Sequence, residues 1–185
     1  TGFSMMTISR ALSNPDKVSK KTKEKIDKVI NKRGYIPNLF AGNLKSGKSG
    51  LIIVVIPSLR TSVFNSYYTG IREILEENKY QPLVGISDYS LEKEESIISK
   101  FLGYKPEGII VVGTKHTKKT KEILLKSNLP LIETWDINHR PLDLIVGFSN
   151  YEAGYNITDY AIQKKYKKIL FVTSSDRHMK VETRG

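Results

Sequence analysis

The sequence predicts an α/β protein in which a doubly wound parallel sheet follows a small, basic, helical module. From Leu51 onward, continuous runs of Val, Ile and Leu alternate with amphipathic stretches of helical period. Such runs are typical of parallel strands that helices bury on both faces. The charge divides the chain at the same place, because residues 1–50 hold 11 Lys and Arg against 3 Asp and Glu, whereas residues 51–185 hold 19 against 16. A basic module on a near-neutral domain indicates nucleic-acid binding, although a solvated lysine-rich face would give the same count.

The overall composition excludes several classes of protein. The chain has 185 residues, of which 39% are hydrophobic and 26% charged, as in an ordinary globular protein. No apolar run approaches the ~18 residues of a membrane span, and the first residues show no basic-then-apolar signal segment. The chain contains no cysteine, which excludes disulfides and thiolate chemistry and favours a cytoplasmic location.

Residues 4–13 are predicted to form a short amphipathic helix. Ser4 is a suitable N-cap, and Met5, Ile8 and Leu12 share one face at the spacing i, i+3 and i+7. This face would pack against the rest of the module.

A turn at residues 14–16 leads to a second helix over residues 20–33. Ser19 precedes this helix as a cap, and Gly34 follows it where a terminal glycine belongs. The other faces are lysine-rich, and the apolar stripe consists of Ile26, Val29 and Ile30. Two short helices cannot bury a core alone, so a partner helix is expected before Thr1.

Residues 38–50 are interpreted as a joint between two domains. Residues 39–45 have helical spacing behind Asn38, a suitable cap, but Gly42 interrupts them, and ~seven residues form only a marginal helix in isolation. Residues 45–50 form a Gly/Ser/Lys linker. The predicted division is therefore into a headpiece, a joint and an α/β domain, at residues 1–37, 38–50 and 51–185.

The α/β part is predicted to alternate strands with helices. Because parallel strands end at the same edge of a sheet, a ligand site is expected at their carboxyl ends. The pattern stops after the last predicted strand, so most of a second half is expected to follow. The strands are placed at 51–56, 82–86, 108–112, 130–134, 144–148 and 169–173, and the helices at 64–79, 92–102, 117–127 and 150–164.

Residues 42–49 fit the phosphate-loop pattern G-x-x-x-x-G-K-S, but their context argues against nucleotide hydrolysis. A phosphate loop follows a strand and opens a helix, so that loop amides and the helix dipole hold the phosphates. Here a helical segment precedes Gly42 and a strand follows Ser49. These residues are better explained as linker.

No other catalytic pattern distinguishes the chain. The three histidines, His116, His139 and His178, have no metal-ligand spacing. Ser58, His116 and Asp136 could be combined into a triad, but any protein of this size allows such a selection, and no G-x-S-x-G is present. The sequence therefore predicts no enzyme, no metal site and no cofactor.

The N-terminal segments carry a resemblance to a known family. Residues 2–13, G-F-S-M-M-T-I-S-R-A-L-S, are followed by N-P-D-K-V-S, T-K-E-K-I and G-Y-I-P-N. These segments resemble the helix-turn-helix DNA-binding headpiece of the LacI/GalR family, and the α/β part is similar to that family's periplasmic-binding-protein-like effector domain. Three later segments resemble the family's repressors of gluconate operons: I-P-S-L-R-T-S-V-F, T-K-H-T-K-K-T and L-D-L-I-V-G-F-S-N-Y-E-A.

The resemblance implies a transcriptional repressor that binds double-stranded operator DNA as a homodimer. A small effector, a sugar or sugar acid such as gluconate, would change its conformation. In the family's plan, the first headpiece helix would lie before Thr1, and most of the C-terminal effector subdomain would lie after Gly185.

The resemblance also assigns roles in the headpiece. Residues 4–13 match the recognition helix, whose exposed N-terminal side chains enter the major groove. Met5 and Met6 occupy base-reading positions and offer apolar contact to thymine methyls, whereas Arg10 can bind guanine bidentately. Packing in the module's own core remains the alternative for Met5. The hydroxyls expected to position the protein on phosphates are those of Ser4, Thr7 and Ser9.

Residues 38–45 match the family's hinge helix. Leu44 lies where the family inserts an apolar wedge into the minor groove, which kinks the duplex. The alternative is ordinary helix packing. Asn38 would cap the helix and reach the backbone, Lys45 would lie beside the groove, and Ala41 is included in this DNA-binding set.

The effector site is expected at the carboxyl ends of the strands. The candidates there could bind sugar hydroxyls, pack on a carbon skeleton or supply positive charge for an acidic ligand such as gluconate. Ordinary loop residues, or a core position for Phe64, are the alternatives. The candidates are Ser58, Phe64, Asn65, Lys115, His116, Asp136 and Asn150.

A second function fits the same fold. A solute-binding protein with this α/β domain would bind a similar ligand and would not bind DNA. The basic segment at residues 1–50 and the absence of an export signal favour the regulator.

Overall fold

The computed structural model describes residues 1–35, 48–137, 140–170 and 172. The chain divides into two compact units, Thr1–Ser49 and Gly50–Gly185, which are described separately. Within the described segments, no helix is both long and apolar enough to cross a membrane.

The N-terminal unit contains two capped helices. α1 spans Met5–Ser13 and α2 spans Lys20–Arg33, with the 3-10 turn η1 at Pro15–Lys17 between them. The Ser4 and Ser19 hydroxyls accept hydrogen bonds from the backbone amides of Thr7 and Thr22, at 3.2 and 3.3 Å. Gly34 ends α2 with a φ of 60°, a left-handed conformation that glycine adopts without strain. The predicted helices and caps are confirmed.

The packed face of α1 differs from the prediction. Met5 is 87% exposed, and Leu12 is also exposed. Ile8 is half-buried, and the buried residues of the two helices are Ala11 and Ile26. The core of this unit therefore involves the side of α1 that carries Ala11 and Ile8, and Met5 lies outside it.

The C-terminal unit contains a sheet of five parallel strands in the order β2-β1-β3-β4-β5. The strands follow the predicted positions closely, except that β5 is shorter than expected. Their bounds are Leu51–Ile56 for β1, Gln81–Ile86 for β2, Gly108–Val112 for β3, Leu131–Thr134 for β4 and Leu144–Val146 for β5.

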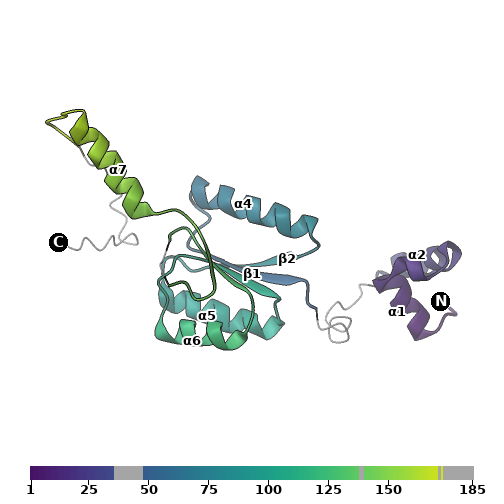
Figure 1. The fold of residues 1–185 in the computed structure, drawn as a ribbon. Coiled ribbons are helices and arrows are strands. Elements are labelled where there is room, and N and C mark those ends of the chain that lie inside the picture. The colour runs from purple at the N-terminus through teal and green to yellow at the C-terminus, as the bar shows by residue number, and fades with distance from the viewer. Residues whose placement is uncertain (36–47, 138–139, 171, 173–185) are drawn as a thin grey trace. The chain divides into compact units, whose positions relative to one another are not determined.

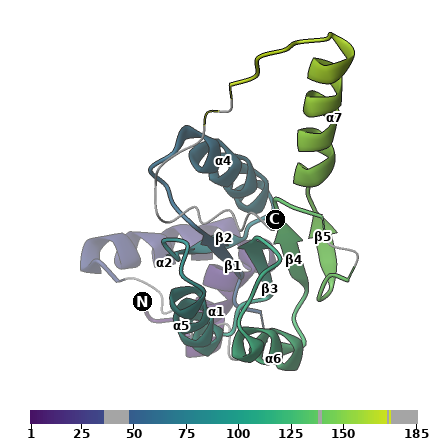
Figure 2. The ribbon, with the colours of Figure 1, turned by 90° about the vertical axis from the view of Figure 1, so that its left-hand side faces the viewer.

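Helices cover both faces of this sheet. α4 (Ser62–Glu77) lies on one face, and α5 (Leu91–Phe101) and α6 (Lys118–Ser127) lie on the other (Figures 1 and 2). A short 3-10 turn, η2 (Leu102–Tyr104), follows α5, and α7 (Asn150–Gln163) follows β5. The strand order reverses beside β1, and right-handed crossovers then place α4 opposite α5 and α6. The doubly wound fold is confirmed.

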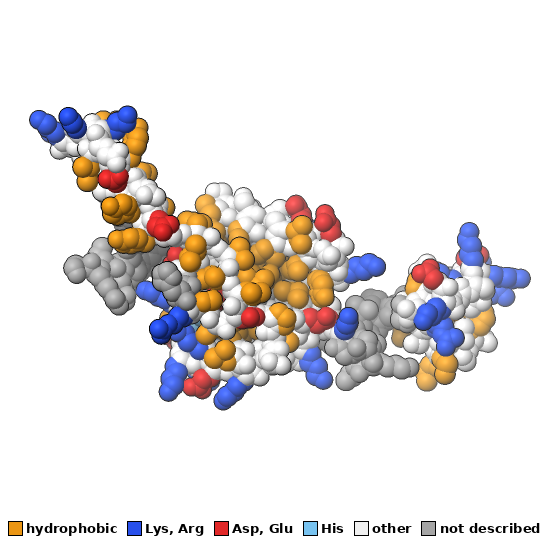
Figure 3. Space-filling model, viewed as in Figure 1, with side chains coloured by type: hydrophobic (Ala, Val, Ile, Leu, Met, Phe, Trp, Pro, Cys, Tyr) orange, Lys and Arg blue, Asp and Glu red, His pale blue; other side chains and the backbone are white. Residues whose placement is uncertain are grey.

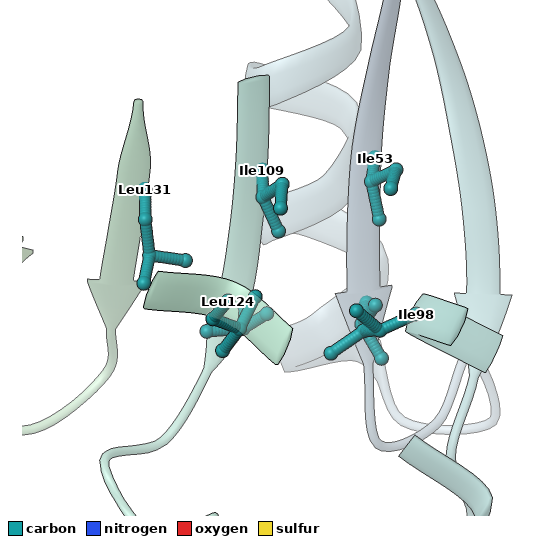
Figure 4. Packing of buried hydrophobic residues seen from close by; sticks show 7 residues of the cluster. Ile53, Ile98, Ile109, Leu124 and Leu131 are labelled. Atoms are coloured by element: carbon teal, nitrogen blue, oxygen red, sulfur yellow. The ribbon is translucent and has the colours of Figure 1, made fainter. Parts of the chain in front are cut away.

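The core lies between the sheet and the α5–α6 layer. Ile53 and Val55 of β1 point into it, together with Ile98 of α5 and Leu124 of α6, all at most 2% exposed. Figure 4 shows these side chains converging from the strands and the two helices. Because β1 is central, its residues on both sheet faces are buried, including Val54 and Ile56.

One predicted strand is wrong. Of residues 169–173, Ile169, Leu170 and Val172 lie outside any strand and are 62–86% exposed, while 171 and 173 lie outside the described residues. A strand requires a neighbour that accepts its backbone hydrogen bonds, and no described strand pairs with this segment. The apolar run alone could not show whether such a neighbour was present.

Replacing Ile98 by alanine is expected to lower the free energy of unfolding by ~3 kcal/mol, because the residue is fully buried and the change leaves a cavity. Ile74→Ala on α4 is the matched control, since Ile74 is 61% exposed. Urea denaturation followed by circular dichroism measures both. Equal losses in the two variants would contradict the described core.

Candidate DNA interface and effector site

The N-terminal end of α1 presents the predicted base-reading side chains to solvent. Met5 and Met6 are 87% and 68% exposed, and Arg10 is exposed one turn further along. The Arg10 Nη2 atom lies 3.9 Å from the Met6 Sδ atom, the i to i+4 contact expected on a helix surface. Two exposed thioethers at the start of α1 and the guanidinium of Arg10 in its last turn are therefore available at the surface.

The surroundings of this surface are basic. Residues 1–35 contain nine Lys and Arg against three Asp and Glu, and Figure 3 shows lysine and arginine side chains on the visible face of this unit. Lys23 forms an exposed ion pair with Asp27 at 3.0 Å, which neutralises one of these charges. The remaining excess is suited to a polyanion such as the DNA backbone.

The predicted hydroxyl donors have different surroundings. Ser4 caps α1, and its Oγ atom lies 2.9 Å from that of Thr7, so these two groups also maintain the helix start. Ser9 is exposed on α1. The other candidates lie outside the described residues, and their roles remain predictions: Asn38, Ala41, Leu44 and Lys45.

The carboxyl edge of the sheet carries an aromatic cluster centred on Trp135. The Trp135 ring lies 4.6 Å from that of Phe64, between centroids, and 5.9 Å from that of Tyr67 in a perpendicular arrangement. Phe148 lies 6.3 Å from Trp135, and Tyr89 lies 6.4 Å from Phe64. Phe148 and Tyr89 are 53% and 40% exposed, so the cluster is open to solvent on this side.

The backbone around Trp135 holds the cluster in place. The backbone of Trp135 has a φ of 83°. Residues other than glycine rarely adopt this conformation, and such residues cluster at functional sites. Its amide donates to the Val146 carbonyl at 3.2 Å, and its carbonyl accepts from Asn150 Nδ2 at 3.3 Å. Gly147 passes so close to Asp136 that a Cβ atom there would collide with the Asp136 backbone. The loops after β4 and β5 are thereby tied together.

Two linked hydrogen bonds join Tyr67 of the aromatic cluster to the sheet. The Tyr67 hydroxyl lies 2.6 Å from Thr134 Oγ1, which in turn donates to the Val111 carbonyl at 3.0 Å. Burial raises the pKa of the Tyr67 phenol, and its hydrogen bond to Thr134 opposes this only in part. Tyr67 therefore stays neutral and fixes α4 against β4.

The structure brings some of the predicted effector residues together. Phe64 lies within the aromatic cluster. Asp136 follows Trp135 in the chain, and the Asn150 side chain donates a hydrogen bond to the Trp135 carbonyl. Asp136 Oδ1 accepts from the Ile137 amide at 2.9 Å. Asn65 and Lys115 are exposed, while Ser58 is buried and accepts from the Arg60 amide at 3.0 Å, which orders its own loop.

His116 is not the exposed loop residue that the sequence suggested. Its side chain is fully buried, with Nδ1 2.6 Å from Glu94 Oε1 and Nε2 3.4 Å from Glu133 Oε1. Both carboxylates are buried too, and Glu133 Oε2 accepts from the Leu142 amide at 2.6 Å. The ring therefore faces two carboxylates and not solvent, and its contact with an effector stays a prediction. The ring instead links α5, the loop after β3 and β4.

The two clusters lie on opposite faces of the sheet. Neighbouring residues of a strand point to opposite faces, and Thr134 meets Tyr67 of α4 while Glu133 meets His116 beside α5. Thr134 and Tyr67 thus lie on the α4 side of the sheet, and the His116 cluster lies on the α5 side. No group of three or more His, Asp or Glu side chains within the described residues is arranged to hold a metal ion.

Comparison with known proteins agrees with both units. Residues 1–38 match the family model described as bacterial regulatory proteins, lacI family. The chain is 33% identical to the HTH-type transcriptional regulator IdnR of Escherichia coli (strain K12), over 95% of the chain and 53% of that protein. It is 31% identical to the regulator GntR of the same strain, over 92% of the chain and 52% of that protein.

A solved structure matches across both units. It is a LacI-family transcriptional regulator from Silicibacter pomeroyi, 36% identical, with a TM-score of 0.81 over 90% of this chain and 50% of that one. The two units therefore define the class of helix-turn-helix regulators with a periplasmic-binding-like domain. Both units are thus similar to proteins of the LacI family. It spans about half the length of the curated relatives it matches.

Sequence reasoning missed most of the aromatic cluster. Trp135, Tyr89 and Phe148 were not selected, although each follows the end of a strand by one to three residues. That placement was a usable signal, because strand ends meet at one edge. Tyr67 lies within α4, and only the packing of that helix against β4 brings it there.

Replacing His116 by glutamine is expected to lower the free energy of unfolding by ~3 kcal/mol, because two buried carboxylates lose the contacts that the imidazole ring makes with both of them. Lys119→Ala is the control. Lys119 pairs with Glu95 at 2.8 Å but is 70% exposed, so its loss should leave the urea midpoint unchanged. An unchanged urea midpoint in His116→Gln would contradict the linking role of this buried cluster.

Proposed function

We propose that this chain provides the DNA-reading and effector-sensing parts of a transcriptional repressor that controls genes for the use of a sugar or sugar acid. The observation that carries the proposal is the exposure of Met5, Met6 and Arg10 on a capped helix in a basic, lacI-type segment. Neither an enzyme nor a simple ligand-binding domain requires such a surface.

The readout follows from the chemistry of these side chains. α1 enters the major groove with its N-terminal end, where Met5 and Met6 contact apolar edges such as thymine methyls. Arg10 donates two hydrogen bonds to guanine O6 and N7. The basic residues of α2 and the hydroxyls of Ser4, Thr7 and Ser9 hold the protein on the phosphates, which fixes its register without reading sequence.

The aromatic edge of the α/β unit binds the effector. Trp135 and Phe148 pack against the C–H face of a sugar skeleton, while Asp136 and Asn150 bind its hydroxyls. Exposed Lys115, after β3, supplies positive charge for the carboxylate of a sugar acid such as gluconate. The similarity to the transcriptional regulators IdnR and GntR supports a role in transcription. The choice of gluconate as effector rests on the segments that resemble gluconate repressors.

The protein acts as a homodimer whose two headpieces bind two half-sites. Residues 38–45 form the hinge, with Leu44 as the minor-groove wedge, and effector binding changes the spacing of the two hinges. The competing function is that of a solute-binding protein that does not contact DNA. It would not explain the basic N-terminal unit or its exposed Met5, Met6 and Arg10.

Replacing Arg10 by alanine is expected to lower discrimination at one operator base pair about tenfold, because a bidentate contact to guanine is lost. The operator is first obtained by selecting random duplexes on the full-length protein, and affinities are then compared at one salt concentration. Arg33→Ala, at the end of α2, is the control, and it should weaken binding equally for all sequences. Equal behaviour of the two variants would exclude Arg10 as a reader.

Sugar acids are expected to change the fluorescence of Trp135, the only tryptophan of the chain, in a saturable way and to alter operator affinity. Gluconate and related sugar acids are titrated against neutral sugars. Phe148→Ala should weaken the effector roughly five- to tenfold through lost ring contact. Tyr104→Ala, similarly exposed but at η2, should not. If no sugar acid produced a response, sugar acids would be excluded as effectors, but the proposed repressor function would not be contradicted.

A further inference from the structure

The reading surface of α1 is built from the side chain most easily oxidised after cysteine. The chain contains three methionines and no cysteine, and two of the three are adjacent at the start of α1. Met5 and Met6 are 87% and 68% exposed, so a small oxidant reaches both sulfur atoms without opening the fold. The third, Met179, lies outside the described residues.

Oxidation would reverse the chemistry of these positions. A peroxide transfers its distal oxygen to the thioether sulfur, so that the O–O bond breaks, an S–O bond forms, and the remaining oxygen leaves as water or an alcohol after taking up a proton. The sulfur is oxidised by two electrons and the peroxide is reduced. The product, methionine sulfoxide, is polar and accepts strong hydrogen bonds.

The position of Arg10 adds a second effect. Its Nη2 atom already lies 3.9 Å from Met6 Sδ, a weak contact with a poor acceptor. A sulfoxide oxygen on the same sulfur would lie within reach of the guanidinium and would accept a charge-assisted hydrogen bond. Arg10 would then be held against its own helix and would be less available to a guanine.

We propose that Met5 and Met6 form a reversible oxidation site that weakens sequence reading by α1 when peroxide rises. The inference rests on the proposed function, because it requires that α1 reads DNA. Met6 carries the larger part, since its sulfoxide captures Arg10, and Met5 contributes the loss of apolar contact.

The test measures operator affinity of the full-length protein before and after hydrogen peroxide, with peptide mass spectrometry to locate added oxygen. Oxidation of Met5 and Met6 should weaken selected-operator binding about tenfold, the loss expected for one good base contact. Binding to unrelated duplex, which depends on phosphates, should change little. Methionine sulfoxide reductases, applied as a pair for the two epimers, should restore the affinity.

Three variants sharpen the result. Met179→Leu should leave the peroxide effect intact. Met6→Leu, whatever its own affinity, should lose most of the effect, and Met5→Leu should lose less, because leucine keeps apolar volume but cannot be oxidised.

Two failures are distinguishable. If the reduced protein selects no operator, both the proposed function and this inference fall. If it binds an operator, and complete oxidation of Met5 and Met6 leaves that affinity unchanged, only the inference falls. An effect that survives in the double variant M5L/M6L, or that the reductases do not reverse, also overturns it.

Discussion

The fold depends on the burial of β1 as an interior strand of a wholly parallel sheet. Both faces of β1 are covered, so its residues are apolar without interruption, and helices must pack on each side. Because all five strands run the same way, their carboxyl ends meet at one edge. The start of α4 after β1 and the loops after β2, β4 and β5 therefore bring Phe64, Tyr89, Trp135 and Phe148 together, although 84 residues separate the first from the last.

The end of β4 shows how one strand serves two purposes. Glu133 points into the core and joins His116 and Glu94, while Thr134 points the other way and joins Tyr67. Trp135 then leaves the strand in a left-handed conformation that turns its ring into the aromatic cluster. Consecutive residues at the end of β4 therefore hold the buried His116 cluster on one side of the sheet and the aromatic cluster at its carboxyl edge.

The N-terminal unit achieves its order by local means. Its helices are fixed by Ser4, Ser19 and Gly34, and its buried residues are few, led by Ala11 and Ile26. Capping contacts of this kind each contribute ~1 kcal/mol, which suits a small module with little core. Met5, Met6 and Arg10 take no part in this small core and remain exposed.

The sequence by itself determined the parts of this protein that depend on neighbours in the chain. Apolar runs identified the five strands, caps identified α1 and α2, and the headpiece segments identified the LacI family. Tertiary structure decided the rest, because side-chain environment depends on elements distant in sequence. It turned Met5 outward, buried His116 between two carboxylates, left residues 169 and 170 outside any strand, and brought Tyr67 to Trp135. A periodic pattern shows which side of an element is apolar, but only packing shows what that side meets.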